Sequence, residues 1–173
     1  ERFGAVAVFN NFIDFDLLAE HSRGQIISPV WNADQQTYGF QDSVFLPTDF
    51  SATFAHPETE KTFSTAASSI QIMDNGHVLM CAARQGRSFE LDENGALVWE
   101  YLTPMRNGIP FPQGSSLNLS DNFTFQLERY PLGYSAFIGR DLSPQGYIET
   151  SPNENFCASV ATEGTRLEET GLN

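Results

Sequence analysis

The chain has 173 residues, of which 40% are hydrophobic and 13% aromatic, enough apolar material for one domain with a core. Its 9 Lys and Arg residues stand against 22 Asp and Glu residues, so the formal charge is −13 and the pI is about 4.4. Nucleic-acid binding needs clustered basic side chains and a membrane helix needs about 20 consecutive apolar residues, so the sequence argues against both.

The first third of the chain predicts short strands at irregular intervals. Gly4 to Asn11 is an apolar run that ends in turn residues, and the runs at 25–31 and 42–46 predict two further strands. Residues 5–48 would then be the last three strands of one meander. The polar segment 47–65, rich in Ser, Thr and Pro, predicts a connection.

The clearest pattern lies between Ala67 and Pro104. Four short apolar runs alternate with three separators, and each separator contains a glycine. Two of the separators hold Asn75-Gly76 and Asn94-Gly95, dipeptides that favour type I′ turns because both central residues need a positive φ. The stretch therefore predicts a four-stranded antiparallel meander.

The last third predicts a loop, a strand and a tail. Residues 104–121 contain prolines at 110 and 112 and a Ser-rich tract and predict a long surface loop. Phe123 to Tyr130 alternates apolar and polar residues, which predicts a half-buried strand. From Ser151 onward the chain is polar and acidic, so we divide it into β-structure over 1–150 and an acidic tail or linker over 151–173.

Successive four-stranded meanders indicate a β-propeller, whose blades take about 40 to 50 residues each. The predicted fold class is all-β: antiparallel four-stranded meanders forming a partial β-propeller of about two blades plus a closing strand. Such a chain cannot close a ring alone. The expected partners are therefore the remaining blades of the propeller or other copies of the chain.

The segment Ser69 to Tyr101 resembles the blade repeat of arylsulfotransferase-like propellers, with its Asp-Asn-Gly turn, its Gly-Arg-Ser-Phe-Glu-Leu-Asp strand and its Val-Trp-Glu-Tyr ending. Residues 5–11 resemble another strand of the family, and residues 129–148 resemble the end of the propeller in its secreted bacterial members. The resemblance implies the C-terminal part of a secreted or cell-surface protein. The implied activity is sulfuryl transfer from aryl sulfates to phenols, without a nucleotide donor, through a transiently sulfated histidine.

Histidines that face the channel in this family open the first strand of a blade, where this chain has Ser68 and Ser69. The resemblance therefore implies a catalytic histidine upstream of Glu1. His56, in the long connection, is the candidate within the chain. His77 lies in a predicted tight turn, where a solvated role is the expectation.

Arg84 and Arg87 flank the turn at the second separator and are the candidate substrate-binding residues. They are either surface charges or the groups that bind a sulfate. Guanidinium groups would offset the charge of a transferring sulfuryl group.

Cys81 and Cys157 permit one disulfide without requiring it, and Cys81 lies on a predicted strand where a small buried hydrophobe is the alternative. Three scattered histidines and two distant cysteines have no zinc spacing, and nucleotide fingerprints are absent, so no metal and no cofactor is predicted. Two functions stay open. One is an aryl-sulfate sulfotransferase, and the other is a non-catalytic extracellular propeller that acts as a ligand-binding, adhesive or assembly module.

Overall fold

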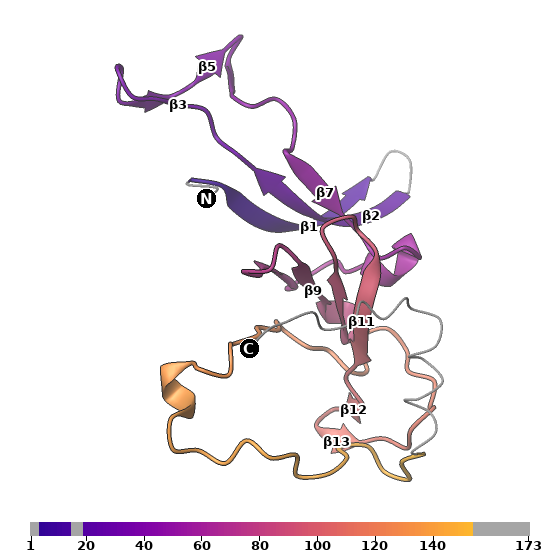
Figure 1. Cartoon of the computed structure of the whole chain (residues 1–173). Helices are drawn as coiled ribbons and strands as arrows, with labels where there is room; N and C mark the ends of the chain where they lie inside the picture. Colours follow the sequence, from indigo (N-terminus) through magenta and orange to yellow (C-terminus); the bar gives the residue numbers. More distant parts are fainter. Residues whose placement is uncertain (1–3, 15–18, 154–173) are drawn as a thin grey trace.

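The computed structural model of the protein describes residues 4–14 and 19–153 (Figure 1). The described residues form antiparallel β-sheets and three short 3-10 helices, η1 (Thr59–Thr62), η2 (Ala83–Gln85) and η3 (Ser135–Phe137), without an α-helix. The all-β prediction is confirmed at this level. Within this part of the chain, no helix is long and apolar enough to cross a membrane.

The first sheet contains three antiparallel strands in the order β1 (Val6–Asp14), β2 (Ala19–Ile27) and β7 (Ala52–Phe54). Three strands in chain order agree with the predicted end of a meander. Two of the strands differ from the prediction in position, because β2 begins at Ala19 instead of residue 25 and β7 lies in the segment expected to be a connection. Residues 28–51 intervene between β2 and β7 and leave the sheet instead of continuing it.

These intervening residues form an arm that projects from the first sheet at the upper left of Figure 1. It contains two small hairpins, β3 (Trp31–Asn32) with β4 (Thr37–Tyr38) and β5 (Phe40–Gln41) with β6 (Val44–Phe45). In each hairpin an aromatic pair crosses the strands edge to face, with ring centroids 5.0 Å apart. Trp31 and Phe45, which fall in the predicted strands, therefore stabilise local two-residue pairings instead.

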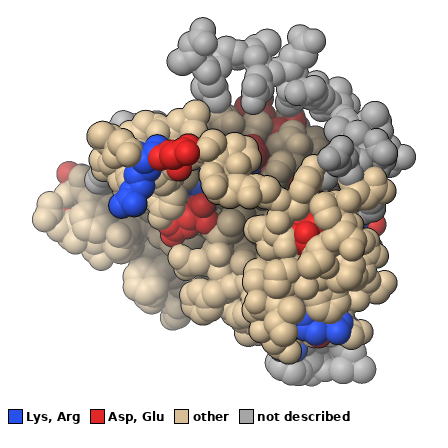
Figure 2. All heavy atoms as spheres, turned by 90° about the horizontal axis from the view of Figure 1, so that it is seen from below, with Lys and Arg blue, Asp and Glu red and all other residues tan. Residues whose placement is uncertain are grey.

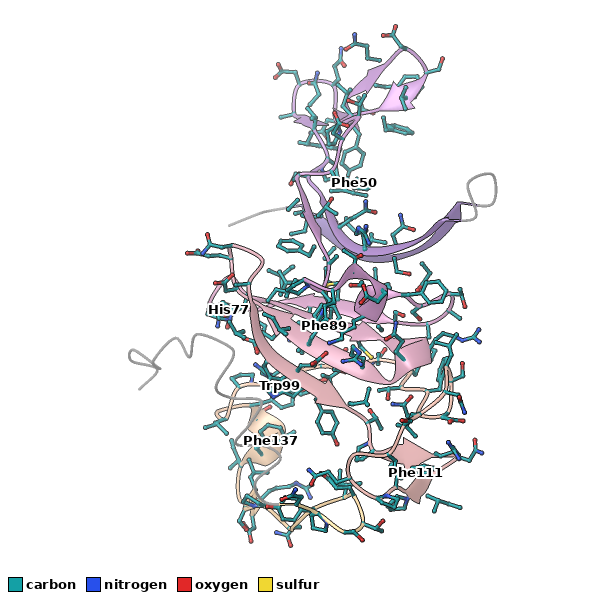
Figure 3. The ribbon with its side chains drawn as sticks, turned by 90° about the vertical axis from the view of Figure 1, so that its right-hand side faces the viewer. Phe50, His77, Phe89, Trp99, Phe111 and Phe137 are labelled. Carbon is teal, nitrogen blue, oxygen red and sulfur yellow. The ribbon has the colours of Figure 1, made fainter. Side chains whose placement is uncertain are left out.

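The second sheet is the predicted four-stranded meander, in the order β8 (Ser69–Ile72), β9 (Val78–Ala82), β10 (Arg87–Leu91) and β11 (Leu97–Leu102). One face of this sheet packs against the first sheet (Figures 1 and 3). The core between the sheets consists of buried and half-buried apolar side chains: Val78, Met80, Phe89 and Leu91, with Phe9, Phe54, Ile70 and Leu97 against them. At Gly24 a Cβ atom would lie 2.8 Å from Ile70 Cδ1, so the glycine allows the sheets to approach closely.

The two Asn-Gly separators form a different turn from the one predicted. Only the glycines, Gly76 and Gly95, have a positive φ, whereas a type I′ turn needs it at the asparagines too. In the second turn Gly95 N–H donates to Asp92 O at 3.0 Å and Asp92 N–H donates to Ala96 O at 2.9 Å. This is a type I turn followed by a glycine bulge, and the Asp92 carboxylate stabilises it by accepting from Asn94 and Ala96 N–H.

The lower part of the molecule begins with a small hairpin, β12 (Met105–Arg106) and β13 (Ile109–Pro110), inside the predicted surface loop. Residues 111–153 then run in extended and irregular backbone, with one parallel bridge between Pro112 and Thr150. Residues 154–173, which include most of the predicted acidic tail, lie outside the described residues.

Phe123 to Tyr130 is not the strand that we predicted. The segment is extended, but it crosses the second face of the β8–β11 sheet and is bound there largely by side chains. Ser69 Oγ donates to Leu127 O at 3.2 Å and accepts from Leu127 N–H at 3.1 Å. The Gln71 amide donates to Arg129 O and accepts from Arg129 N–H, each at 2.8 Å. Because the side chains replace a backbone ladder, the alternation does not produce a strand, and Phe125 remains 68% exposed.

Candidate functional site

The second face of the β8–β11 sheet carries several of the polar side chains of the sheet. Antiparallel pairing places Ser88 opposite Cys81 and Glu90 opposite Leu79, so side chains at these positions point away from the core that contains Phe89. The segment from 123 to 130 covers this face. Polar groups therefore meet between the sheet and the covering segment.

Glu90 is the centre of a buried charge cluster on this face. Its side chain is only 7% exposed, one oxygen lies 2.6 Å from His77 Nδ1, and the other forms an ion pair with Arg129. The Arg129 guanidinium also lies over the Trp99 ring, 5.2 Å from the centroid. His77 is therefore a partner of a buried carboxylate and not the solvated turn residue we expected.

Sequence reasoning missed this cluster, although part of its signal is visible. The run Arg87 to Leu91 alternates polar and apolar residues, which already places Ser88 and Glu90 on one face. The cation that pairs with Glu90 is 39 residues further along the chain. No local pattern identifies such a partner.

A cavity of about 690 Å³ lies beside β11, the outer strand of the second sheet. Its walls come from β11, from the loop after it and from one residue of the last described segment. The lining residues are mostly apolar or aromatic: Val98, Trp99, Glu100, Tyr101, Leu102, Pro104, Phe111, Pro112, Gln113, Gly114, Ser115, Leu117 and Glu149. A cavity of roughly 300 to 1,000 Å³ with an apolar wall and a few polar groups is the usual form of a small-molecule site.

Two stacked rings form one wall of this cavity. Trp99 and Tyr101 are two residues apart on β11, their ring centroids are 6.0 Å apart, and the ring planes differ by 13°. In Figure 3 the labelled Trp99 extends below the sheet, on the side of the loop that carries Phe111. Each of the two β11 rings is 37% exposed, so a ligand can reach them.

Glu149 supplies the charge of the cavity wall. Gln113 Nε2 donates to its Oε1 at 3.3 Å, and among the described residues no Lys, Arg or His lies within 4.0 Å of its carboxylate. Burial, and then the nearby Glu149 charge, raise the pKa of Tyr101 above its usual value. The phenol therefore stays neutral at physiological pH, and the wall combines neutral rings with a carboxylate.

His56, the candidate catalytic residue, is 2% exposed and lies between η1 and the second sheet. Its Nδ1 accepts the Glu58 backbone N–H at 3.0 Å, so we assign the ring proton to Nε2, which lies 3.3 Å from Glu100 Oε1. The ring packs edge to face on Phe89, with centroids 5.2 Å apart. Burial lowers the pKa of His56 despite the nearby carboxylate, so the imidazole is neutral at physiological pH.

The two candidate arginines differ in their partners. Arg87 forms an ion pair with Glu100, so a carboxylate of the chain already offsets its charge. Arg84 donates instead to hydroxyl groups, from Nε to Ser120 Oγ at 2.7 Å and from Nη1 to Thr65 Oγ1 at 3.0 Å. Within the described ranges no carboxylate lies within 4.0 Å of Arg84, so its charge is available to an anion.

Cys81 is fully buried on β9, and its thiol donates to Thr124 O at 3.4 Å. Burial raises the pKa of this thiol, as expected for a small hydrophobe in a core. Cys157 lies outside the described residues, so the possible disulfide stays a prediction. In the described part of the chain no group of three or more His, Cys, Asp and Glu side chains could hold a metal ion.

Comparisons with protein families, with curated proteins and with solved structures found no match to this chain. The arrangement itself therefore carries the functional argument. Of the residues predicted from sequence, His56 and Arg87 converge on Glu100, while Arg84 lies apart from them. The aromatic cavity combines residues that sequence reasoning did not bring together.

Proposed function

We propose that this chain forms two consecutive blades of an arylsulfotransferase-like β-propeller and serves as a binding module. It would bind neighbouring blades or further copies through an open sheet edge, and a small ligand through the cavity beside β11. The observation that carries the ligand-binding role is the aromatic wall of this cavity with the Glu149 carboxylate, which among the described residues has the Gln113 amide and no cation as partner. The resemblance of Ser69 to Tyr101 to a blade repeat supports the propeller, as do two antiparallel sheets packed face to face.

The edge of β1 supports the assembly role. Among the described residues β1 pairs only with β2, so one edge of a nine-residue strand has no hydrogen-bonded neighbour. This strand has no Pro, no Lys and no Arg, and the side chains of Val6 and Val8 on it are exposed. A long apolar edge of this kind is a template for another strand, which here would complete the first sheet to four strands.

The lower surface also has the character of an interface. Seen from below, most of the described surface is neither acidic nor basic (Figure 2). Large apolar side chains of the segments after β13, among them Phe125, Leu132 and Ile138, are well exposed. Exposed apolar surface of this extent is typical of a protein that is covered by a partner. A secreted or cell-surface location belongs to the same proposal and rests on the resemblance.

We expect the isolated chain to associate, and Val8→Lys to reduce the associated fraction several-fold. When another strand pairs with β1, a lysine at this position would have to be desolvated, which costs free energy. Native mass spectrometry and light scattering over a range of protein concentrations measure this. Ser143→Lys, in an exposed segment, is the matched control because it changes the net charge equally and should leave association unchanged.

Two results would contradict the assembly role. One is a monodisperse monomer of the unmodified chain at every concentration. The other is equal association of the Val8→Lys and Ser143→Lys variants, which would place the contact away from the β1 edge.

Sulfuryl transfer from aryl sulfates is the second candidate, and Arg84 is the observation that favours it. Its guanidinium is oriented by two hydroxyl groups and has no carboxylate partner among the described residues. Such a group could stabilise the oxygens of a transferring sulfuryl group. The cavity beside β11 suits an aryl sulfate less well, because Glu149 would repel the sulfate.

Release of p-nitrophenolate from p-nitrophenyl sulfate, with a phenol as acceptor, tests this candidate on the chain together with the blades that complete it. If Arg84 holds the sulfuryl group, Arg84→Gln lowers the rate about 10²-fold. Arg87→Gln is the comparison, since Glu100 already pairs with that arginine. Absence of transfer in the completed assembly would leave the binding module as the function.

A further inference from the structure

We infer that the cavity beside β11 binds an organic ammonium cation, with the charged head between the exposed ring faces and the Glu149 carboxylate. This inference rests on the proposed ligand-binding role of the cavity and adds the chemical class of the ligand. It follows from three observations on the lining residues: the rings, the charge balance and the contacts that these rings already make.

The rings provide the attractive surface. Trp99 and Tyr101 are stacked nearly parallel and exposed, and Phe111 lies in the wall formed by the following loop. Aromatic faces carry partial negative charge and attract ammonium groups, and Trp does so most strongly. Clusters of such rings bind quaternary ammonium ligands in general.

The charge balance of the wall selects a cation over an anion. The lining contains two carboxylates, Glu100 and Glu149, and no Lys, Arg or His. Arg87 offsets Glu100, whereas Glu149 has only the Gln113 amide among the described residues. An anionic ligand would be repelled here, and a neutral ligand would leave the Glu149 charge without an opposite charge.

The rings of the wall already bind cations on part of their surface. The Arg129 guanidinium lies over Trp99, and the Arg106 guanidinium lies over Phe111, 4.3 Å from the ring centroid. These arginines do not make the cavity positive, because Arg129 pairs with Glu90 and Arg106 pairs with Asp121. The two contacts show that both rings make cation–π contacts in this environment.

The size of the cavity restricts the ligand further. About 690 Å³ is much more than a trimethylammonium group needs, so the ligand carries an apolar or aromatic body besides its cationic head. The apolar wall of Leu102, Pro104 and Leu117 would contact this body. A trimethylammonium compound is therefore a minimal probe that fills only the charged end.

Choline and its uncharged carbon isostere, 3,3-dimethylbutan-1-ol, form the probe pair, because they share a shape and differ in charge. The chain has two tryptophans, so the Trp31→Phe variant leaves Trp99 as the only tryptophan reporter of the cavity. Trp31 lies on the projecting arm, and phenylalanine preserves its edge-to-face contact with Tyr38. Titration of Trp99 fluorescence to tens of millimolar probe, with calorimetry as a second readout, measures binding.

We expect choline to give a saturable change and the isostere to bind at least about five-fold more weakly. Glu149→Gln should weaken choline binding about five-fold and leave isostere binding unchanged. Glu93→Gln, an exposed carboxylate in the turn between β10 and β11, is the matched control and should have no effect.

The possible outcomes test separately whether the cavity binds a ligand and whether that ligand is a cation. Equal binding of choline and the isostere, unchanged by Glu149→Gln, would overturn the cationic class while the ligand-binding role of the cavity stands. Absence of binding by both probes would overturn the cavity as a ligand site and this inference with it. Equal weakening by Glu149→Gln and Glu93→Gln would show that only the net charge matters, which also overturns the inference.

Discussion

Replacing Gly86 with alanine is expected to destabilise the protein by about 3 kcal/mol, because among the described glycines an added Cβ atom would make its closest contact here. Gly86 is buried, has φ of +55°, and a Cβ atom there would lie 2.1 Å from the backbone oxygen of Asn122. About 1 kcal/mol of the effect comes from the left-handed backbone and the rest from the clash with a backbone atom. Urea unfolding followed by tryptophan fluorescence, at several protein concentrations, measures the free energy of unfolding.

Gly76→Ala separates the two contributions. Gly76 has φ of +84°, and no heavy atom lies within 4 Å of the position that the added methyl group would occupy, so only the backbone contribution applies, about 1 kcal/mol. If both alanine variants lose the same stability, the close contact between η2 and Asn122 is not present in solution. That contact matters because Asn122, whose Nδ2 donates to Thr103 O, joins the end of β11 to the segment that covers the polar face.

Replacing Arg129 with methionine is expected to cost about 3 kcal/mol, more than most changes at a residue that is 43% exposed. The reason lies in its partner, because Glu90 is 7% exposed and would keep a buried charge without the guanidinium that pairs with it. Methionine retains an unbranched aliphatic side chain of similar length but removes the guanidinium that lies over Trp99. The free energy of unfolding and the Trp99 emission of the Trp31→Phe background report the loss.

The opposite change should be milder. Glu90→Gln leaves the Arg129 guanidinium half-exposed and able to hydrate, so we expect a loss of about 1 kcal/mol. The double variant should therefore be more stable than Arg129→Met alone, since it no longer buries an unpaired carboxylate. Arg140→Met, which removes an exposed arginine bonded only to a backbone oxygen among the described residues, should change stability by less than about 0.5 kcal/mol. Equal losses for Arg129→Met and Arg140→Met would show that the Glu90 cluster does not form.

One segment of the chain contributes both to the stability effects described above and to the proposed binding cavity. Residues 123–130 cover the polar face through Gln71 and Glu90, and Arg129 of the same segment lies on Trp99, the first ring of the cavity wall. Loss of the Arg129 ion pair should therefore change the cavity as well as the stability. A change in the choline titration of Arg129→Met would follow from this contact.

Local patterns determined the central sheet. The apolar runs between Ala67 and Pro104, with a glycine in each separator, were sufficient to predict β8 to β11 and their order, because neighbouring strands joined by short turns pair with each other. The turn type was wrong, since the Asp92 side chain stabilises a three-residue turn and bulge that the Asn-Gly dipeptide alone does not reveal.

Tertiary structure decided the rest. The apolar and polar alternation of Phe123 to Tyr130 fits a strand, but Ser69 and Gln71 bind its backbone across the face of the sheet and replace the ladder. The cavity likewise joins β11 to Phe111 and Glu149, residues that are close only after the chain has folded. Sequence by itself therefore determined the elements whose contacts are local, whereas contacts between distant segments, which depend on packing and buried charge, determined the candidate site.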